Sequence, residues 1–316
     1  MRPRPNSTPT SYRVLLSSSG RKAQRRKSAL ASAEQLVPVG FSLAAVLCWG
    51  TSDFTGGYAS KRSDAFIITL LSHAGGFVLM LALALLTHAP YPSPSSRSWA
   101  LLAGALGGTA LAIFYRALAS GDMGSTAPVA AVLGAAIPAA FAMITQGLPG
   151  TLSIAGFVLA GLGIWLISRP DGSARSYAGI TMAVLAGVGF AGFFICIDRA
   201  GDSSALWSAV HSRVASLVIV AAIVLFRRGW LGQRPTRLQP TGAALALFAG
   251  CLDVSGTALF IRAEQTGRLD TAVVLSSLYP VITVVLARAV LRERFTRWKT
   301  IGIFAALAAV PLIALP

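Results

Sequence analysis

Residues 276–310 read SSLYPVITVVLARAVLRERFTRWKTIGIFAALAAV, which is two apolar runs joined by a short basic segment. A helix that crosses the roughly 30 Å hydrocarbon layer of a membrane needs about 20 mostly apolar residues, because each residue rises about 1.5 Å. The two runs extend over residues 269–291 and 297–315. Each run is therefore long enough for one span, and the stretch predicts two membrane helices joined by a tight loop.

The rest of the chain repeats this pattern. The sequence is 54% hydrophobic and only 12% charged, whereas a soluble domain carries about 25% charged residues. The runs lack the alternation of barrel strands, and lipid forces each segment to pair its own backbone groups. We therefore expect an all-α polytopic membrane protein with ten transmembrane helices. The expected spans are 37–59, 65–88, 99–119, 124–145, 151–168, 177–198, 204–226, 241–263, 269–291 and 297–315.

The two halves of the chain resemble each other. GFSLAAVLCWG, which begins at Gly40, resembles GITMAVLAGVG, which begins at Gly179. In the second and seventh spans, SDAFIITLLSHAGG aligns with SSALWSAVHSRVAS and sets His73 opposite Arg213. Such internal repeats are common in transporters, whose binding site lies at the repeat interface.

A repeat of five spans has a topological consequence. Because five is odd, the second copy must enter the membrane with the opposite orientation. We therefore expect two inverted five-helix repeats, over residues 37–168 and 177–315. Pro138 and Pro280 lie in the middle of the matching fourth and ninth spans.

The quoted stretch resembles the EamA family of the drug/metabolite transporter superfamily. The hallmark of that family is a Pro-containing helix, a short loop with Glu-Arg and a Gly-containing last helix. The matching residues are Pro280, Glu293, Arg294 and Gly302. The resemblance covers residues 37–315 and implies that spans one, three, four, six, eight and nine line a central cavity. The first repeat departs from it, with TQGLPGTLS in place of the Glu-Arg loop and His73 where an arginine is common.

Two carboxylates lie inside predicted spans. A charge at mid-bilayer costs about 2.5–3.5 kcal/mol on insertion scales, so such residues usually face the bundle interior or a wet cavity. Asp53, in LCWGTSDFTGG, shares a stripe with Gly50 and Gly57, and Asp253 lies on a face with Thr257. We expect both acids to bind substrate or a coupling ion. The alternative for Asp53 is that it only bonds a neighbouring helix.

The remaining candidate residues fall into two groups. Those expected to line the substrate cavity or to take part in coupling are Trp49, Tyr115, Ser276, Ser277 and Tyr279. Structural or gating roles are expected for Arg213, His73, Pro138, Pro280, Glu293 and Arg294. A lone intramembrane arginine such as Arg213 pairs with a carboxylate or with carbonyls freed at a proline more often than it contacts substrate, and the resemblance places Arg213 and His73 away from the cavity.

These features predict a secondary transporter, with export favoured over import, that moves a small polar or amphipathic metabolite by alternating access. Protons are one candidate coupling ion. An uncoupled facilitator of the same fold is the first alternative. The second is a membrane-embedded enzyme or lipid-handling protein, in which His73, Asp53 and Asp253 would be catalytic. The sequence contains no P-loop, no His-Glu-x-x-His and no paired Cys-x-x-Cys, so we expect no enzyme activity, cofactor or metal centre.

Charges give conflicting indications of orientation in the membrane. The formal net charge is +16, and residues 1–36 hold eight basic residues and one acid in a Ser- and Pro-rich run that is expected to be disordered beside anionic lipid. A nucleic-acid arm and a transit peptide are the alternatives for this tail. Twelve Lys and Arg lie in the loops of the opposite face, which favours that face as cytoplasmic.

The family usually has both termini in the cytoplasm, in agreement with the basic tail. We therefore expect a multi-pass protein of the cell membrane, most readily a bacterial inner membrane, with cytoplasmic termini. Its partners are expected to be lipid and a small-molecule substrate, with a homodimer left open and no nucleic acid.

Overall fold

The computed structural model describes residues 36–120, 123–167, 169, 177–201, 204–229, 238–292 and 296–314. The basic tail before residue 36 and the Glu293–Arg294 pair lie outside these residues. Within the described part the chain is helical and contains no strand. The prediction of an all-α polytopic fold is confirmed.

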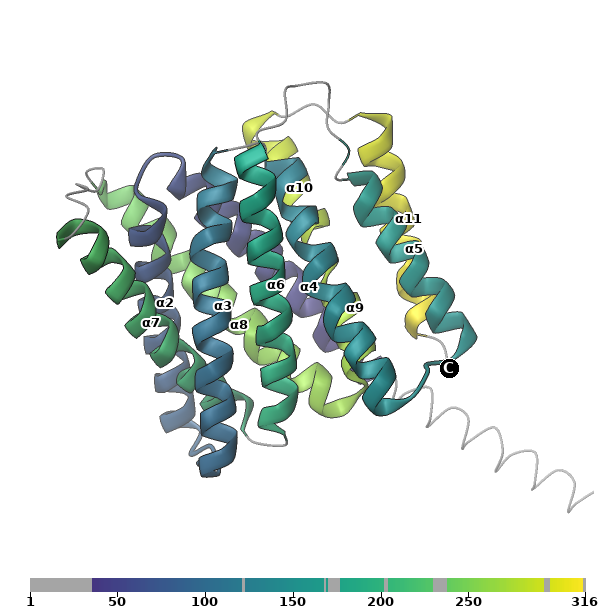
Figure 1. Cartoon of the computed structure of the whole chain (residues 1–316), viewed down its shortest axis with the longest axis horizontal. Helices are drawn as coiled ribbons and strands as arrows, with labels where there is room; N and C mark the ends of the chain where they lie inside the picture. The colour runs from purple at the N-terminus through teal and green to yellow at the C-terminus, as the bar shows by residue number, and fades with distance from the viewer. Residues whose placement is uncertain are drawn as a thin grey trace, which may run out of the picture.

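Ten spans cross the described part of the molecule (Figure 1). The first is Leu36–Ser60, which carries no label in the figure. The others are α2 (Ala65–Leu86), α3 (Pro94–Ser120), α4 (Met123–Gln146), α5 (Thr151–Ile167), α6 (Tyr177–Ala200), α7 (Ala205–Gly229), α8 (Pro240–Thr266), a broken span made of α9 (Leu269–Ser276) and α10 (Tyr279–Leu291), and α11 (Arg297–Ala314). Eight of these spans are long and apolar enough to cross a membrane by length and composition, and α5 is a shorter apolar helix.

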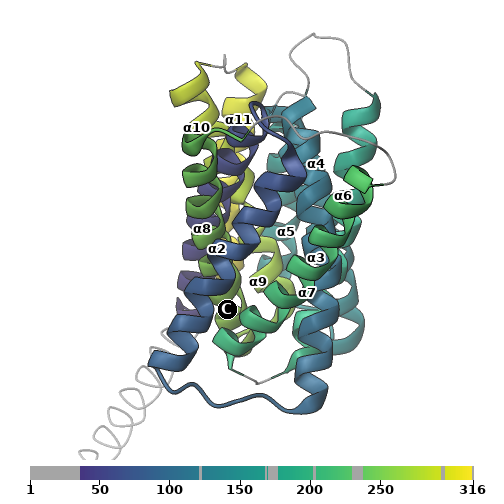
Figure 2. The same ribbon diagram turned by 90° about the vertical axis from the view of Figure 1, so that its left-hand side faces the viewer.

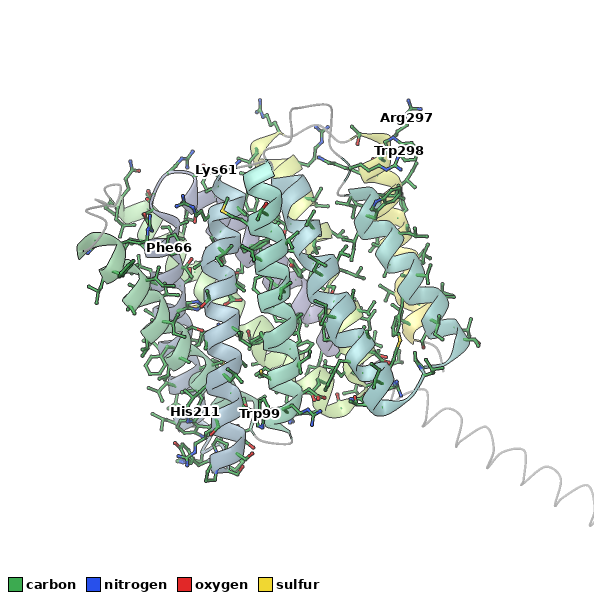
Figure 3. All side chains as sticks on the ribbon, viewed as in Figure 1. Lys61, Phe66, Trp99, His211, Arg297 and Trp298 are labelled. Atoms are coloured by element: carbon green, nitrogen blue, oxygen red, sulfur yellow. The ribbon has the colours of Figure 1, made fainter. Side chains whose placement is uncertain are left out.

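The ends of the bundle carry the polar and amphipathic side chains. Figure 3 shows Lys61, Arg297 and Trp298 at one end and Trp99 and His211 at the other. Trp and basic residues are typical of the two membrane–water interfaces. The positions of these side chains therefore agree with helices that run across a bilayer.

Glycines let the two repeats cross closely. A Cβ on Gly250 of α8 would collide with the Ser72 carbonyl of α2, and a Cβ on Gly104 of α3 would collide with the Ser212 carbonyl of α7. Ser72 also donates to the Ala246 carbonyl at 2.9 Å. In the repeat alignment α2 matches α7 and α3 matches α8, so the two crossings are equivalent. Small residues at such positions are the usual means by which membrane helices approach each other.

Two groups of helices face each other across the bundle. Figure 2 separates α2, α8 and α10 on one side from α3, α4 and α6 on the other. The helices α5 and α11 pack on each other at the edge of the bundle in Figure 1, through mutual close contact of Gly163 and Gly302. Each of the two groups therefore contains helices of both repeats, and the α5–α11 pair lies at the edge of the bundle.

Candidate functional site

A cavity lined by helices of both repeats contains ≈ 630 Å³ of empty space, a figure that includes the open space at its mouth. One wall comes from the first span, α8 and the α9–α10 break, and consists of Trp49, Asp53, Asp253, Thr257, Ser277 and Tyr279. The facing wall comes from α3, α4 and α6, and includes Gly104, Gly107, Gly108, Ala130, Gly134, Phe190, Phe193 and Phe194. Arg213 and Ser216 of α7 also line the cavity. The cavity therefore has one polar, acidic wall and one wall of glycines and phenylalanines.

The first span is fixed in place by contacts on both sides of Asp53. Trp49 donates from Nε1 to the Asp253 carbonyl at 3.0 Å, and Ser52 donates to the Ala249 carbonyl at 2.8 Å. Gly256 of α8 leaves room for the Trp49 indole ring, which a Cβ would contact at 2.6 Å. These contacts attach the first span to α8 and set the direction in which Asp53 points.

Asp53 itself is buried, with 6% of the residue exposed, and lies at the cavity wall. Among the residues that the structure describes, none forms an ion pair with its carboxylate or donates a hydrogen bond to it. Ser52 cannot serve this purpose because its hydroxyl already donates to Ala249. Asp53 is thus a buried acid whose charge the described protein does not neutralise.

Asp253 has a different environment. Its Oδ2 lies 2.7 Å from Nη2 of Arg213, an ion pair by distance whose N–H direction falls outside hydrogen-bond geometry. Arg213 also donates to the Thr257 hydroxyl at 3.0 Å and to His73 Nδ1 at 3.5 Å. Thr257 in turn donates to the Asp253 carbonyl at 3.0 Å. The Arg213–Asp253 ion pair therefore joins α7 to α8, and the contact between Arg213 and His73 connects this pair to α2.

The contact between His73 and Arg213 has a simple origin. The repeat alignment matches these two residues, and the structure brings them together where α2 and α7 pack side by side. In an inverted repeat, matched residues that touch lie at the symmetry axis. The expectation that Arg213 stays away from the cavity is wrong, because the close α3–α7 crossing at Gly104 and Gly108 brings it to the wall. His73 is 1% exposed and is not among the lining residues.

The ninth span breaks inside the membrane region. The chain leaves the helix at Ser277 and re-enters it at Tyr279, with the Ser277 N–H bonded to the Val273 carbonyl and the Leu278 N–H to the Leu275 carbonyl. Pro280 lies in the first turn of α10, where its missing N–H costs nothing. Ser277 and Tyr279 line the cavity, whereas the buried Ser276 hydroxyl does not and has no hydrogen-bond partner among the described residues. Broken helices of this kind supply backbone groups to transporter binding sites.

Pro138, for which a structural or gating role is expected, lies within a continuous α4, whereas Pro280 follows the break in the ninth span, so the two matched prolines are not structurally equivalent. One further sequence expectation differs from the structure. Tyr115 is fully buried behind the first span and not at the cavity, with its ring against Gly56 and its hydroxyl 3.4 Å from Ser52. It is therefore a packing residue for the helix that carries Asp53.

Sequence reasoning missed the phenylalanine wall. Phe190, Phe193 and Phe194 occupy FAGFF in α6, the helix that matches the first span in the repeat. Gly192 lies in this segment at the position that matches Asp53. The repeat alignment could therefore have indicated that this face of α6 looks toward the centre.

The family profile described as "EamA-like transporter family" matches residues 177–315. The second repeat belongs to this transporter family. An EamA-like domain is thus present over α6 to α11, which includes Arg213, Asp253 and the α9–α10 break.

Solved structures extend the similarity to the first repeat. A structure titled "Crystal structure of protein" superposes with a TM-score of 0.68 at 16% identity, and the match covers 90% of this chain and 98% of that chain. In all, 29 solved chains match. At this identity the likeness shows the fold alone. The comparison with curated protein sequences finds no match. The EamA-like domain and the helical bundle together indicate a membrane transporter.

Proposed function

We propose that this protein is a secondary transporter that exports a small polar or amphipathic metabolite through the central cavity by alternating access. The observation that carries the proposal is the cavity itself, which is lined by helices of both repeats near the middle of the spans. Its wall contains Asp53, a buried acid without a partner among the described residues.

Contacts that close one end of the bundle support alternating access. On the face where residue 36 lies, Arg268 donates to the Gly147 carbonyl at 2.6 Å and to Asp270 at 2.8 Å, which joins the ends of α4 and α9. Gln265 donates to the Gly201 carbonyl at 3.3 Å, which joins the ends of α8 and α6. These bonds must break before the cavity can open to that face.

Proton coupling follows from the position of Asp53. An acid that no described residue neutralises must take up a proton or a cation when it is enclosed, because an isolated charge is poorly solvated there. Exchange of a proton for substrate at this carboxylate would couple flux to the pH gradient. The enzymatic alternative requires His73, Asp53 and Asp253 to lie together. His73 contacts Arg213 and is not among the described lining residues of the cavity, whereas Asp53 and Asp253 are.

The test begins with a metabolite panel from the medium and cytosol of cells with and without the protein. We expect at least one small metabolite to rise in the medium and fall in the cytosol on expression. That solute is then followed in proteoliposomes with and without a pH gradient.

The outcomes separate the parts of the proposal. Identical metabolite profiles, together with no flux of any panel solute in proteoliposomes, would overturn the transporter. Flux that ignores the pH gradient and survives Asp53→Asn would overturn proton coupling, and would favour the uncoupled facilitator if no accumulation against a gradient occurs.

A further inference from the structure

The described cavity wall has a net formal charge of −1. Three of its residues carry a formal charge, namely Asp53, Asp253 and Arg213. Asp253 and Arg213 cancel each other at 2.7 Å. His73 bonds to Arg213 and does not reach the wall. One uncompensated negative charge is left, and it belongs to Asp53.

The repeat symmetry shows why there is only one such charge. The position matching Asp53 in the second repeat is Gly192, and the position matching Asp253 in the first is Gly107. The facing wall therefore lacks acids at both matched positions. A second cationic group in the cavity would find no free carboxylate among the described lining residues, because Asp253, the other acid among them, is already paired with Arg213.

Aromatic rings line the same cavity as the free carboxylate. Trp49, one helical turn before Asp53, has its ring centroid 6.4 Å from that of Tyr279 and 5.8 Å from that of Phe194. Phe193 continues this group at 5.4 Å from Phe194. Aromatic faces attract cations held within about 6 Å of the ring centroid, and they also stack on aromatic groups.

The opposite wall is built of glycines with phenylalanines packed on them. At Gly134, a Cβ would lie 3.4 Å from Phe190, and at Gly107 a Cβ would lie 2.9 Å from Phe193. The phenylalanines therefore pack directly on these glycines, and the wall that they form is apolar and aromatic. The cavity combines one free negative charge with several aromatic rings.

We propose that the substrate class is an organic monocation with an aromatic or flat apolar part, held by Asp53 through its charge and by the wall around Trp49 and Phe194 through its ring. This inference rests on the proposed transport function and specifies what the same cavity accepts. Anions are disfavoured by Asp53, and dications lack a second free carboxylate.

The test measures binding by isothermal titration calorimetry to the purified full-length protein in lipid nanodiscs. The probes are benzyltrimethylammonium, which cannot lose its charge, benzyl methyl ether as a neutral ligand of similar size, and phenylacetate as an anion. We expect benzyltrimethylammonium to bind at least about tenfold more tightly than either of the other two. Equal binding of the three probes, preference for phenylacetate or no binding of benzyltrimethylammonium would overturn the inference.

Variants assign the preference to one carboxylate. Asp53→Asn is expected to remove the tenfold preference, and Asp53→Glu is expected to retain it, which excludes simple misfolding as the cause. Asp64→Asn is the matched control, because Asp64 caps α2 far from the cavity and asparagine also caps helices. A preference that persists in Asp53→Asn would overturn the role of Asp53.

The charge count has its own test. The probe is p-xylylene-bis(trimethylammonium), which carries two fixed positive charges on one ring. It is expected to bind no more tightly than benzyltrimethylammonium, whereas clearly tighter binding of the dication would overturn the count. The binding tests can fail while the proposed transport function stands. Flux of a neutral or anionic metabolite without binding of the cation would overturn this inference and leave the proposed transport function intact.

Discussion

Removing one member of the Arg213–Asp253 pair should strongly destabilise the protein. The charged atoms lie 2.7 Å apart, and the side chains are only 5% and 12% exposed. At an effective dielectric constant of about 20, this distance corresponds to an attraction of about 6 kcal/mol. Desolvation cancels much of that gain, but a charge left buried without its partner typically costs about 3–5 kcal/mol. We expect Asp253→Asn and Arg213→Gln each to lose an amount in this range.

The double variant should be far less affected than the sum of the two single variants. Replacing both charges leaves neutral amides of similar size, and such replacements of buried pairs are often close to neutral. The assay is equilibrium unfolding in mixed micelles with increasing sodium dodecyl sulfate, followed by circular dichroism. A double-mutant cycle then gives the coupling energy, which we expect to exceed about 2 kcal/mol.

A second ion pair supplies the control. Arg227 and Asp64 lie 3.3 Å apart at a helix end, and both side chains are 17% exposed. Such partly exposed pairs contribute about 0–1 kcal/mol. The same cycle on Arg227→Gln and Asp64→Asn should therefore give a much smaller coupling energy. Equal coupling energies for the two pairs would refute the reasoning, as would a double variant as unstable as the sum of its singles.

Three further outcomes are expected. Gly250→Ala should destabilise the fold by about 1–3 kcal/mol, because the added Cβ meets the Ser72 carbonyl. Gly161→Ala should be neutral or slightly stabilising, because its Cβ meets nothing within 4 Å. Unfolding in mixed micelles compares the two variants, and equal effects would contradict the close packing at Gly250. Pro280→Ala should slow flux in proteoliposomes without loss of stability, because a backbone donor returns at the helix break; unchanged flux would contradict a role for the break. A reporter fused after Pro316 should fluoresce as green fluorescent protein and be inactive as alkaline phosphatase, and the reverse result would place the C-terminus outside.

The spans could be predicted closely because membrane helices are defined by apolar length. The first span was expected over 37–59 and lies at Leu36–Ser60, and the second was expected over 65–88 and lies at Ala65–Leu86. The third begins at Pro94 instead of residue 99. Hydropathy reports the lipid-facing run, whereas the helix continues through polar residues until a cap or proline ends it, so helix ends beyond the apolar run escape this method.

The site could be predicted only in part. Asp53 and Asp253 were identifiable because an acid in an apolar run is rare, and the structure places both at one wall. The partner of Asp253 could not be chosen from sequence, since it depends on how closely α3 and α7 cross. Tyr115 shows the same limit, because its 0% exposure results from packing against Gly56 and not from any feature of its own helix. Contacts between distant helices therefore determine which polar residues reach the cavity.

Blocking the cavity tests the central claim most directly. Gly134 of α4 faces the cavity and has room for a Cβ at 3.4 Å from Phe190, so Gly134→Phe would place a ring inside the cavity. Gly161→Phe adds the same ring on α5, where nothing lies within 4 Å. The measurement is proteoliposome flux of the solute that the metabolite panel identifies, with monodisperse protein for both variants. We predict that Gly134→Phe reduces flux to the protein-free background while Gly161→Phe stays near the unmodified protein. Full flux through Gly134→Phe would contradict transport through this cavity.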